Sequence, residues 1–192
     1  GSYLYNCFFS YKYLSPFATQ NYILTPPGVF FGGEKYRDRL YGPLYGTNPA
    51  SALWREYAKA DRRWGGADLT VISLELLTVF VGGPLAVYLC SLLARGYGEP
   101  GRNKGKVGGK VAFWMSVLAT GELYGGFMTF APEWLSGNSS LDGSNWMYLW
   151  VYLVFFNMLW VFIPLWVLYV AYGSITGAEP LREAKEKVKK TT

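Results

Sequence analysis

Two carboxylates interrupt the most apolar parts of this sequence. Residues 71–80 read V-I-S-L-E-L-L-T-V-F, in which Glu75 stands among apolar side chains, Ser73 and Thr78. Glu122 occupies a similar place in residues 111–130. A charged side chain at the centre of a bilayer costs at least about 2.5–3.5 kcal/mol, so an acid in such a segment indicates function by default. Proton transfer is the chemistry that such an acid can perform.

Other polar and aromatic side chains recur at helical spacing near these acids. Thr78 follows Glu75 by three residues and Asp68 precedes it by seven, which places all three on one face of a helix. In another apolar segment Asn157 and Trp160 are also three apart. Together with Glu122, these groups could line one interior cavity. Taken singly, Asn157 could instead join helices, and Thr78 could bond its own backbone.

Three segments are long and apolar enough to position these residues in a membrane. The chain has 192 residues, of which 51% are hydrophobic and 16% charged, whereas soluble domains average about 25% charged. A spanning helix needs about 20 mostly apolar residues, and residues 69–93, 111–130 and 146–172 meet this requirement. We therefore predict an all-α membrane protein, a helical bundle with three transmembrane helices. Proline and glycine break the apolar runs of residues 1–52, which we expect to be irregular or interfacial.

Basic residues predict the topology. Five lie between the first two spans and five in the tail 177–192, while the loop between the last two spans has none. The positive-inside rule places the first loop and the basic tail in the cytoplasm. The final K-K-T-T resembles a retrieval signal of the endoplasmic reticulum, so we expect a multi-pass protein of that membrane with a cytoplasmic C-terminus. Because the basic residues flank spans, we expect contacts with membrane lipid and none with nucleic acid.

The composition excludes several kinds of catalysis. The chain has no histidine and two cysteines, which removes histidine-based triads, histidine zinc sites and structural zinc sites. Neither a phosphate-binding P-loop nor a dinucleotide-binding glycine motif occurs. Carboxylate, tyrosine and lysine remain for acid and base work, and we expect no metal and no cofactor.

Several motifs in residues 53–176 together resemble the emopamil-binding protein family, the sterol isomerases with an EXPERA domain. They are L-W-R-E-Y-A-K-A-D-R-R-W at 53–64, L-E-L-L-T at 74–78 followed by G-P-L at 83–85, G-E-L-Y-G at 121–125, and F-N-M-L-W at 156–160. Asp61, Asp68, Glu75 and Gly83 keep the family's spacing without a gap. We therefore predict an EXPERA-type transmembrane domain over residues 53–176.

The resemblance implies a five-span, often dimeric protein that moves a sterol double bond from the 8,9 to the 7,8 position. An acid protonates the alkene, a carbocation forms, and a base removes a neighbouring proton. Cationic amphiphilic inhibitors imitate that cation. The resemblance makes Glu75 an acid, base or cation-stabilising group with Thr78 as its neighbour, and gives Asn157 an orienting role and Trp160 a cation–π role. Glu122 is the further catalytic candidate, and the predicted substrate contacts are Asp61, Asp68 and Tyr124.

The chain departs from the family pattern at two places. The family carries an H-x-x-x-E pair before the L-W-K-E-Y segment, whereas this chain has no histidine there, and Glu34 only approaches the position of that acid. Where the family has G-Q-x-Y-G-D, this chain has Glu122 and Gly126. Two functions therefore stay open: a double-bond isomerase of sterols or related polycyclic isoprenoids, or a catalytically incomplete protein that binds sterols or cationic amphiphiles.

Overall fold

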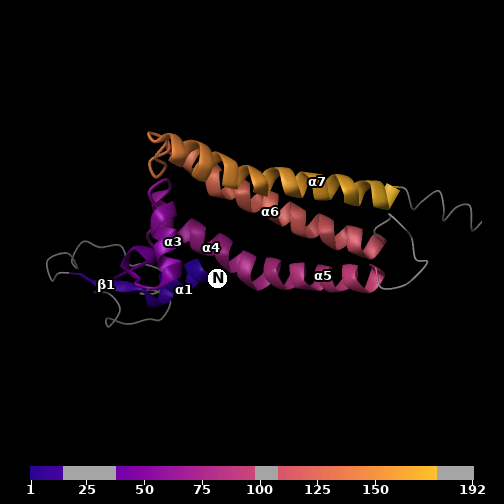
Figure 1. The fold of residues 1–192 in the computed structure, drawn as a ribbon, viewed down its shortest axis with the longest axis horizontal. Helices are drawn as coiled ribbons and strands as arrows, with labels where there is room; N and C mark the ends of the chain where they lie inside the picture. The colour runs from indigo at the N-terminus through magenta and orange to yellow at the C-terminus, as the bar shows by residue number, and fades with distance from the viewer. Residues whose placement is uncertain (15–37, 98–107, 177–192) are drawn as a thin grey trace, which may run out of the picture. The chain divides into compact units, whose positions relative to one another are not determined.

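The computed structural model describes residues 1–14, 38–97 and 108–176 (Figure 1). The chain divides into two compact units, each treated separately below. The first comprises Gly1–Val79 and Phe127–Met158, and the second comprises Phe80–Gly126 and Leu159–Thr192. The predicted basic tail and Glu34 lie outside the described residues.

The first unit begins with regular structure where the sequence suggested irregular chain. Helix α1 covers Ser2–Phe9, and strand β1, Tyr11–Tyr13, pairs antiparallel with strand β2, Arg39–Tyr41. A short 3₁₀ turn, η3, follows at Pro43–Tyr45. Residues 1–52 were expected to be irregular or interfacial: α1, β1, β2 and η3 are regular, and the interfacial alternative stays a prediction. The reason is tertiary: α1 buries Tyr3, Leu4 and Cys7, and this packing stabilises a helix too short to be stable alone.

Three polar side chains cap the elements that follow. Helix α3, Pro49–Tyr57, is capped by Asn48, whose side chain accepts from the Ser51 amide. Asp61 precedes the 3₁₀ turn η4, Arg62–Trp64, and accepts from the Arg63 amide. Asp68 precedes helix α4, Leu69–Leu77, and accepts from the Val71 amide at 3.0 Å. Each cap pairs a backbone N–H that would otherwise have no partner at a helix start.

The core of the first unit joins α1 to α4 beneath a set of aromatic rings. Tyr3, Leu4 and Cys7 pack with Val71 and Ile72, and the partly buried residues against them include Trp54 and Trp64. The two indole rings stack with centroids 4.8 Å apart and planes 10° apart. The ring of Tyr3 meets both edge-on, at 5.7 Å and 5.0 Å. This packing fixes residues 54–64 against the start of α4.

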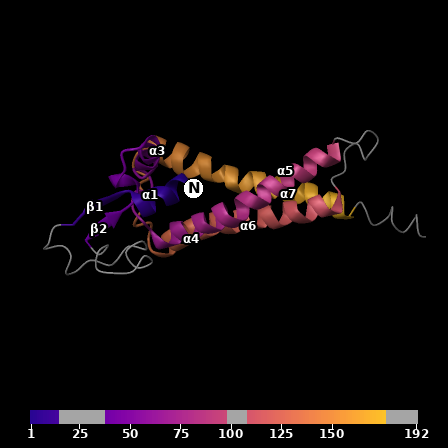
Figure 2. The same cartoon turned by 90° about the horizontal axis from the view of Figure 1, so that it is seen from below.

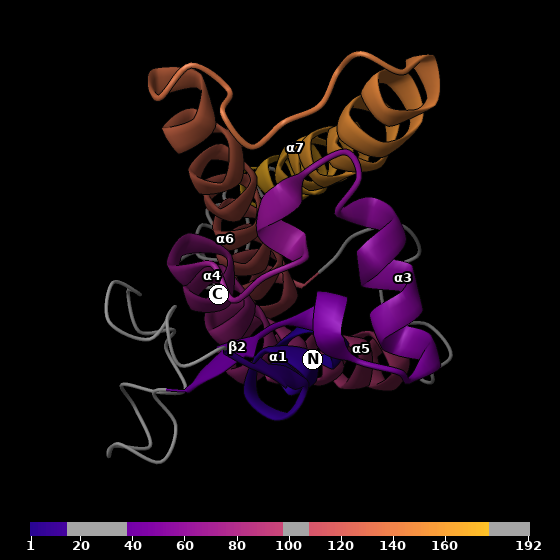
Figure 3. The same cartoon turned by 90° about the vertical axis from the view of Figure 1, so that its left-hand side faces the viewer.

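The loop after α6, Gly109–Leu135, completes the first unit. Backbone hydrogen bonds join it to the turn before η4: the Arg62 amide donates to Ser140, and the Asp142 amide donates to Ala60. Helix η6, Met147–Phe155, then runs on with π-type turns. In Figure 3, α1, β2 and α3 of the first unit lie nearest the viewer.

The described part of the second unit consists of helical segments. It contains most of the π-type turn η5, Thr78–Gly82, then α5, Gly83–Tyr97, the first two thirds of α6, and most of α7, Phe156–Thr176 (Figure 2). Tyr88 of α5 meets Trp114 of α6 edge-on, with ring centroids 6.1 Å apart. The Lys110 ammonium lies 5.6 Å from the centre of the Tyr88 ring. These contacts join α5 to α6.

Two described helices are long and apolar enough to cross a membrane, namely Leu69–Arg95 and Met147–Thr176. Their bounds agree with the predicted spans 69–93 and 146–172. The predicted span 111–130 is also helical, as part of the 27-residue α6, but α6 is not among the qualifying helices. It carries Lys110, Glu122, Glu133 and several glycines, which lower its apolar character. The all-α expectation is confirmed apart from the short strand pair, and two of the three predicted spans are supported by length and composition.

Candidate functional site

Glu75 lies near the end of α4, just before the helix changes its winding. Its side chain is 17% exposed, and one carboxylate oxygen is 3.6 Å from the amino nitrogen of Gly1. Thr78 begins the π-type turn η5 and is exposed. Such π turns are rare and frequent at functional sites. The acid and the hydroxyl are therefore on consecutive turns of one helix, as the spacing predicted.

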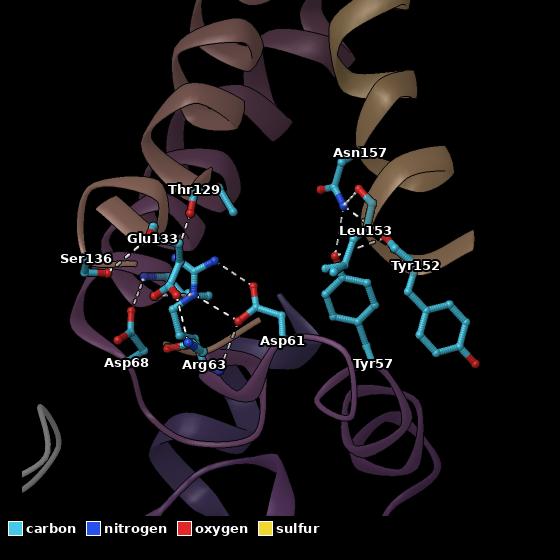
Figure 4. Close-up of polar contacts among 12 residues, drawn as sticks. Tyr57, Asp61, Arg63, Asp68, Thr129, Glu133, Ser136, Tyr152, Leu153 and Asn157 are labelled. Atoms are coloured by element: carbon cyan, nitrogen blue, oxygen red, sulfur yellow. Dashed lines mark hydrogen bonds and ion pairs between the residues drawn. The ribbon is translucent and has the colours of Figure 1, made fainter. Parts of the chain in front are cut away.

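Asn157 joins two helices that are far apart in sequence (Figure 4). Its amide nitrogen donates to the Tyr57 hydroxyl at 3.1 Å, and to the carbonyls of Tyr152 and Leu153 at 3.0 and 2.8 Å. These two carbonyls precede Asn157 by five and four residues, where η6 gives way to α7. The Asn157 side chain thus hydrogen-bonds two carbonyls at the point where π winding changes to α winding, and it positions the Tyr57 phenol of α3. The alternative that Asn157 joins helices describes these contacts.

Tyr57 is the polar end of the aromatic cluster of the first unit, and no residue-type argument had selected it. Its ring meets Trp64 edge-on at 5.7 Å and stacks on Tyr152 at 6.1 Å. Burial raises the pKa of the Tyr57 phenol, against a hydrogen bond from Asn157 that lowers it. The only sequence signal was its place in the L-W-R-E-Y motif beside the aromatic residues Trp54 and Trp64.

Asp61 belongs to a buried network of charges. It is fully buried, and both its oxygens accept from Arg63, at 2.9 Å from Nε and 2.7 Å from Nη2. Arg63 also donates to the Thr129 carbonyl at 2.6 Å and lies 3.6 Å from Glu133. Glu133 accepts from the Ser140 amide at 2.9 Å. The network fastens η4 to the end of α6 and to the loop after it.

The electrostatics of this network explain why Arg63 tolerates burial. Burial by itself lowers the pKa of the guanidinium, but hydrogen bonding and charge attraction from Asp61, with Glu133 and Asp68 in addition, give a net rise. The Asp61 carboxylate is fully buried, and both of its oxygens accept hydrogen bonds from Arg63. It is therefore not accessible to a ligand in this structure. Its predicted substrate contact stays a prediction, and the geometry gives it a structural partner instead.

Asp68 lies at the start of the helix that carries Glu75. Its side chain is occupied in part by the Val71 amide, and it is half-buried. Sequence spacing put it on one helical stripe with Glu75, but Asp68 is the extended residue that precedes α4 and is not part of the helix. Asp68 thus orients the first turn of α4.

The remaining predicted residues belong to the second unit. Glu122 and Tyr124 lie on α6, the acid half-buried and the phenol 55% exposed. Trp160 lies on α7, one turn after Asn157, and its indole is 55% exposed. The structure therefore brings Glu75, Thr78, Asp61, Asp68 and Asn157 into one unit and these three residues into the other. Within the described residues, no group of three or more acidic, cysteine or histidine side chains could hold a metal ion.

The fold and the position of Glu75 define a mainly helical protein with an acid inside a helix apolar enough to cross a membrane. A family profile described as EXPERA, the expanded EBP superfamily, matches residues 49–171. The chain therefore belongs to the EXPERA superfamily. The match covers Tyr57, the Asp61 network, Glu75 and Asn157, and it leaves α1 and the strand pair outside.

Curated relatives carry sterol isomerase names. The chain is 29% identical over 135 residues to the 3-beta-hydroxysteroid-Delta(8),Delta(7)-isomerase of Cavia porcellus, which covers 70% of this chain and 54% of that protein. The corresponding Mus musculus protein is 28% identical over the same shares. The isomeliandiol synthase of Melia azedarach is 25% identical over 142 residues, covering 74% of this chain and 61% of that protein. The chain thus spans about half the length of the first two relatives.

Proposed function

We propose that this chain is a sterol double-bond isomerase domain that converts an 8-ene to a 7-ene, acting on sterols or related polycyclic isoprenoids. The observation that carries the proposal is the position of Glu75, an acid within the apolar helix Leu69–Arg95 and within the residues that match the family. The names of the relatives support the reaction class. The substrate and the activity are inferences for this chain.

The proposed reaction moves one proton onto the substrate and another off it. An acid adds a proton to C9, the electron pair of the 8,9 double bond forms the new C–H bond, and C8 becomes a carbocation. A base then removes a proton from C7, whose C–H pair becomes the 7,8 double bond. Atoms and electrons balance without a redox change, so the proposal requires neither a metal nor a redox cofactor.

Each predicted residue has a role in this scheme. Glu75 donates or accepts a proton or stabilises the cation, since a carboxylate in a dry site interacts strongly with positive charge. Thr78 hydrogen-bonds that carboxylate, Asn157 orients the site from its anchor on Tyr57, and Trp160 faces the cation with its ring. Glu122 is a second acid, and Tyr124 and Asp68 contact the substrate. Asp61 is the third predicted substrate contact, and its ion pair with Arg63 would hold it in place.

The proposal extends to partners and place in the cell. Two helices apolar enough to span a bilayer support a membrane protein, which we infer to be multi-pass, in the endoplasmic reticulum, with a cytoplasmic C-terminus. Lipophilic amines bind as mimics of the carbocation, and a homodimer is the assembly we expect. Each of these statements rests on the family resemblance and the distribution of basic residues.

The test is conversion of an 8-ene sterol by the 192-residue chain in microsomes that lack their own isomerase. We expect the 7-ene product to appear and, in deuterated water, to carry one deuterium at C9. General acid–base catalysis contributes about 10²–10⁴-fold, so Glu75→Gln should reduce conversion by that factor. Glu56→Gln, which changes a partly exposed acid of the same unit paired with Lys59, should leave it unchanged. Full activity in Glu75→Gln would refute the assigned role.

A second function is favoured by the absence of histidine from the whole sequence. On this view the chain binds sterols or cationic amphiphiles without converting them. A radiolabelled lipophilic amine would then bind to membranes that contain the chain, Glu75→Gln and Trp160→Ala would abolish binding, and no tested 8-ene would turn over. Appearance of the deuterated 7-ene excludes this function.

A further inference from the structure

Helix α1 carries aromatic side chains on its exposed face as well as apolar side chains on its buried face. Its buried face includes Asn6, which is fully buried and bonded through both amide atoms, donating to the Ser2 carbonyl and accepting from Ser10 and Asn48. Its opposite face exposes Tyr5 by 55% and Phe9 by 64%, with ring centroids 5.1 Å apart. A surface helix in water normally presents polar side chains outward. Exposed aromatic side chains of this kind are typical of the boundary between membrane and water.

The contacts of α1 place it beside the start of the candidate span Leu69–Arg95. Its side chains pack on Val71 and Ile72, within the first turn of the candidate span Leu69–Arg95. The amino nitrogen of Gly1 lies beside Glu75, and the Cys7 thiol donates to the Gly66 carbonyl at 3.6 Å. At 1.5 Å per residue, Glu75 is about 9 Å beyond Leu69. Helix α1 therefore runs alongside the entry of the span and extends just outside it.

The strand pair after α1 continues the same kind of surface. Tyr11 and Tyr13 of β1 lie edge to face at 5.4 Å, and the Arg39 guanidinium lies 4.3 Å from the centre of the Tyr11 ring. Tyrosine and arginine are residues that favour the headgroup region, because each combines an apolar body with a polar end. The exposed aromatic side chains of α1, its contacts with the start of the candidate span, and the tyrosine–arginine contacts of the strand pair all favour a position at the membrane surface.

We propose that the outer face of α1, formed by Tyr5 and Phe9, lies in the headgroup–acyl boundary of the bilayer and anchors the first unit to the membrane surface. The occupant of this face is lipid, not protein. The proposal concerns residues outside the EXPERA match and is independent of whether Glu75 is catalytic. It gives the N-terminal segment a binding function distinct from the spans.

The test uses single nitroxide labels on the full chain in vesicles of phosphatidylcholine and phosphatidylserine. Cys90 is replaced by serine, and Cys7 is retained because it is buried. Labels are placed at Tyr5→Cys and Phe9→Cys, with Ser139→Cys in the exposed loop as the water control and Phe162→Cys in the candidate span Met147–Thr176 as the lipid control. Collision rates with oxygen, which concentrates in lipid, and with a water-soluble nickel chelate are then measured.

We expect the ratio of oxygen to nickel collisions at residues 5 and 9 to exceed that at residue 139 by at least about fivefold and to approach that at residue 162. A ratio equal to that at residue 139 would place the face in water and overturn the proposal. Protection from both agents would show a protein cover, such as a second copy, and would also overturn it. Continued resistance of Cys7 to maleimide shows that each labelled variant keeps the packing of α1.

Discussion

Asn157 and Tyr57, separated by 100 residues, are joined by a hydrogen bond of 3.1 Å from the amide nitrogen to the phenol oxygen. The same amide donates to the Tyr152 and Leu153 carbonyls at the point where π winding gives way to α winding. One side chain therefore joins α3 to α7 and pairs backbone groups of its own helix. Because this pair belongs to the family-matching region, it is the central positional constraint on the proposed site.

Replacing either member of this pair should lower stability by different amounts. Tyr57→Phe removes the hydrogen bond from Asn157 at 3.1 Å and a long one to the Tyr152 carbonyl at 3.5 Å, and it should cost about 0.5–1.5 kcal/mol. Asn157→Leu removes all three and should cost about 1–3 kcal/mol, because the carbonyls that lose their partner are partly buried. Thermal unfolding in detergent, followed by circular dichroism, measures both. Tyr148→Phe, a phenol of η6 that stacks on Tyr152, should change stability by less than about 0.5 kcal/mol. A loss in that variant as large as in Tyr57→Phe would contradict the account.

Substitution of Arg63 should lower the free energy of unfolding far more than substitution of its neighbour Arg62. Arg63→Met leaves the buried carboxylates of Asp61 and Glu133 without their cation and should cost about 3–5 kcal/mol. Arg62→Met changes an exposed arginine one residue away and should stay within about 0.5 kcal/mol. Urea unfolding in mild detergent can compare the two. Equal stability of the two variants would show that the ion pairs contribute nothing.

Stability should fall in alkaline solution, and Cys7 should account for part of the fall. Burial raises the pKa of the Cys7 thiol to about 12 from 9.0. Above pH 9 the unfolded chain releases this proton while the folded chain keeps it, so the contribution is complete below pH 9 and lost between pH 9 and 12. The slope is at most about 1.4 kcal/mol per pH unit. Melting temperatures measured from pH 8 to 10 should decline less in Cys7→Ala than in the wild type, and parallel declines would disprove the link.

Two glycines near η4 should respond differently to alanine. Gly42 has φ of +142°, and a Cβ there would lie 2.6 Å from the Gly65 carbonyl oxygen and 2.7 Å from Gly66 Cα. That conformation alone costs a residue with a side chain about 1–3 kcal/mol, and the overlap with backbone adds to it. Gly66 has an ordinary backbone and open space around it. Gly42→Ala should lower the unfolding midpoint in urea strongly, whereas Gly66→Ala should lower it little. A midpoint shift for Gly66→Ala that matched Gly42→Ala would rule out the steric reason.

Apolar length predicted the position of the long helices well. The span predicted over residues 69–93 begins at the same residue as α4, Leu69. The segment near 111–130 is helical as predicted, yet it is less apolar than its length suggested. Helix α1 could not be predicted, because no side chain caps it and the packing that stabilises it comes from residues some 70 positions away. A local pattern does not contain that information.

The candidate site was predictable only in its intrahelical part. Glu75 and Thr78 follow from spacing within one helix, although winding changes at Thr78 and the face assumed from α-helical spacing applies only up to that point. The partners of Asp61 and Asn157 could not be inferred, since each contact joins segments distant in sequence. Tyr57 was overlooked because a tyrosine in an aromatic-rich chain has no distinguishing type or spacing. The catalytic and substrate-binding roles of all the predicted residues stay predictions: Glu75, Thr78, Asn157, Trp160, Glu122, Asp61, Asp68 and Tyr124.

The first unit consists of two stretches that are separated in the sequence. Its contacts between the two stretches can therefore form only after the second stretch has been synthesised. Arg63 and the Thr129 carbonyl are 66 residues apart, and the first stretch of the second unit, Phe80–Gly126, is made between them. At about 5–20 residues per second, Arg63 and Asp61 emerge about 3–13 s before their partners on α6. Until then the Arg63 guanidinium has Asp61 beside it but neither of its partners on α6, so its other donors must stay hydrated. The Arg63 network is therefore also a late assembly step, and a nascent chain stopped before residue 129 should keep the segment 58–66 open to protease.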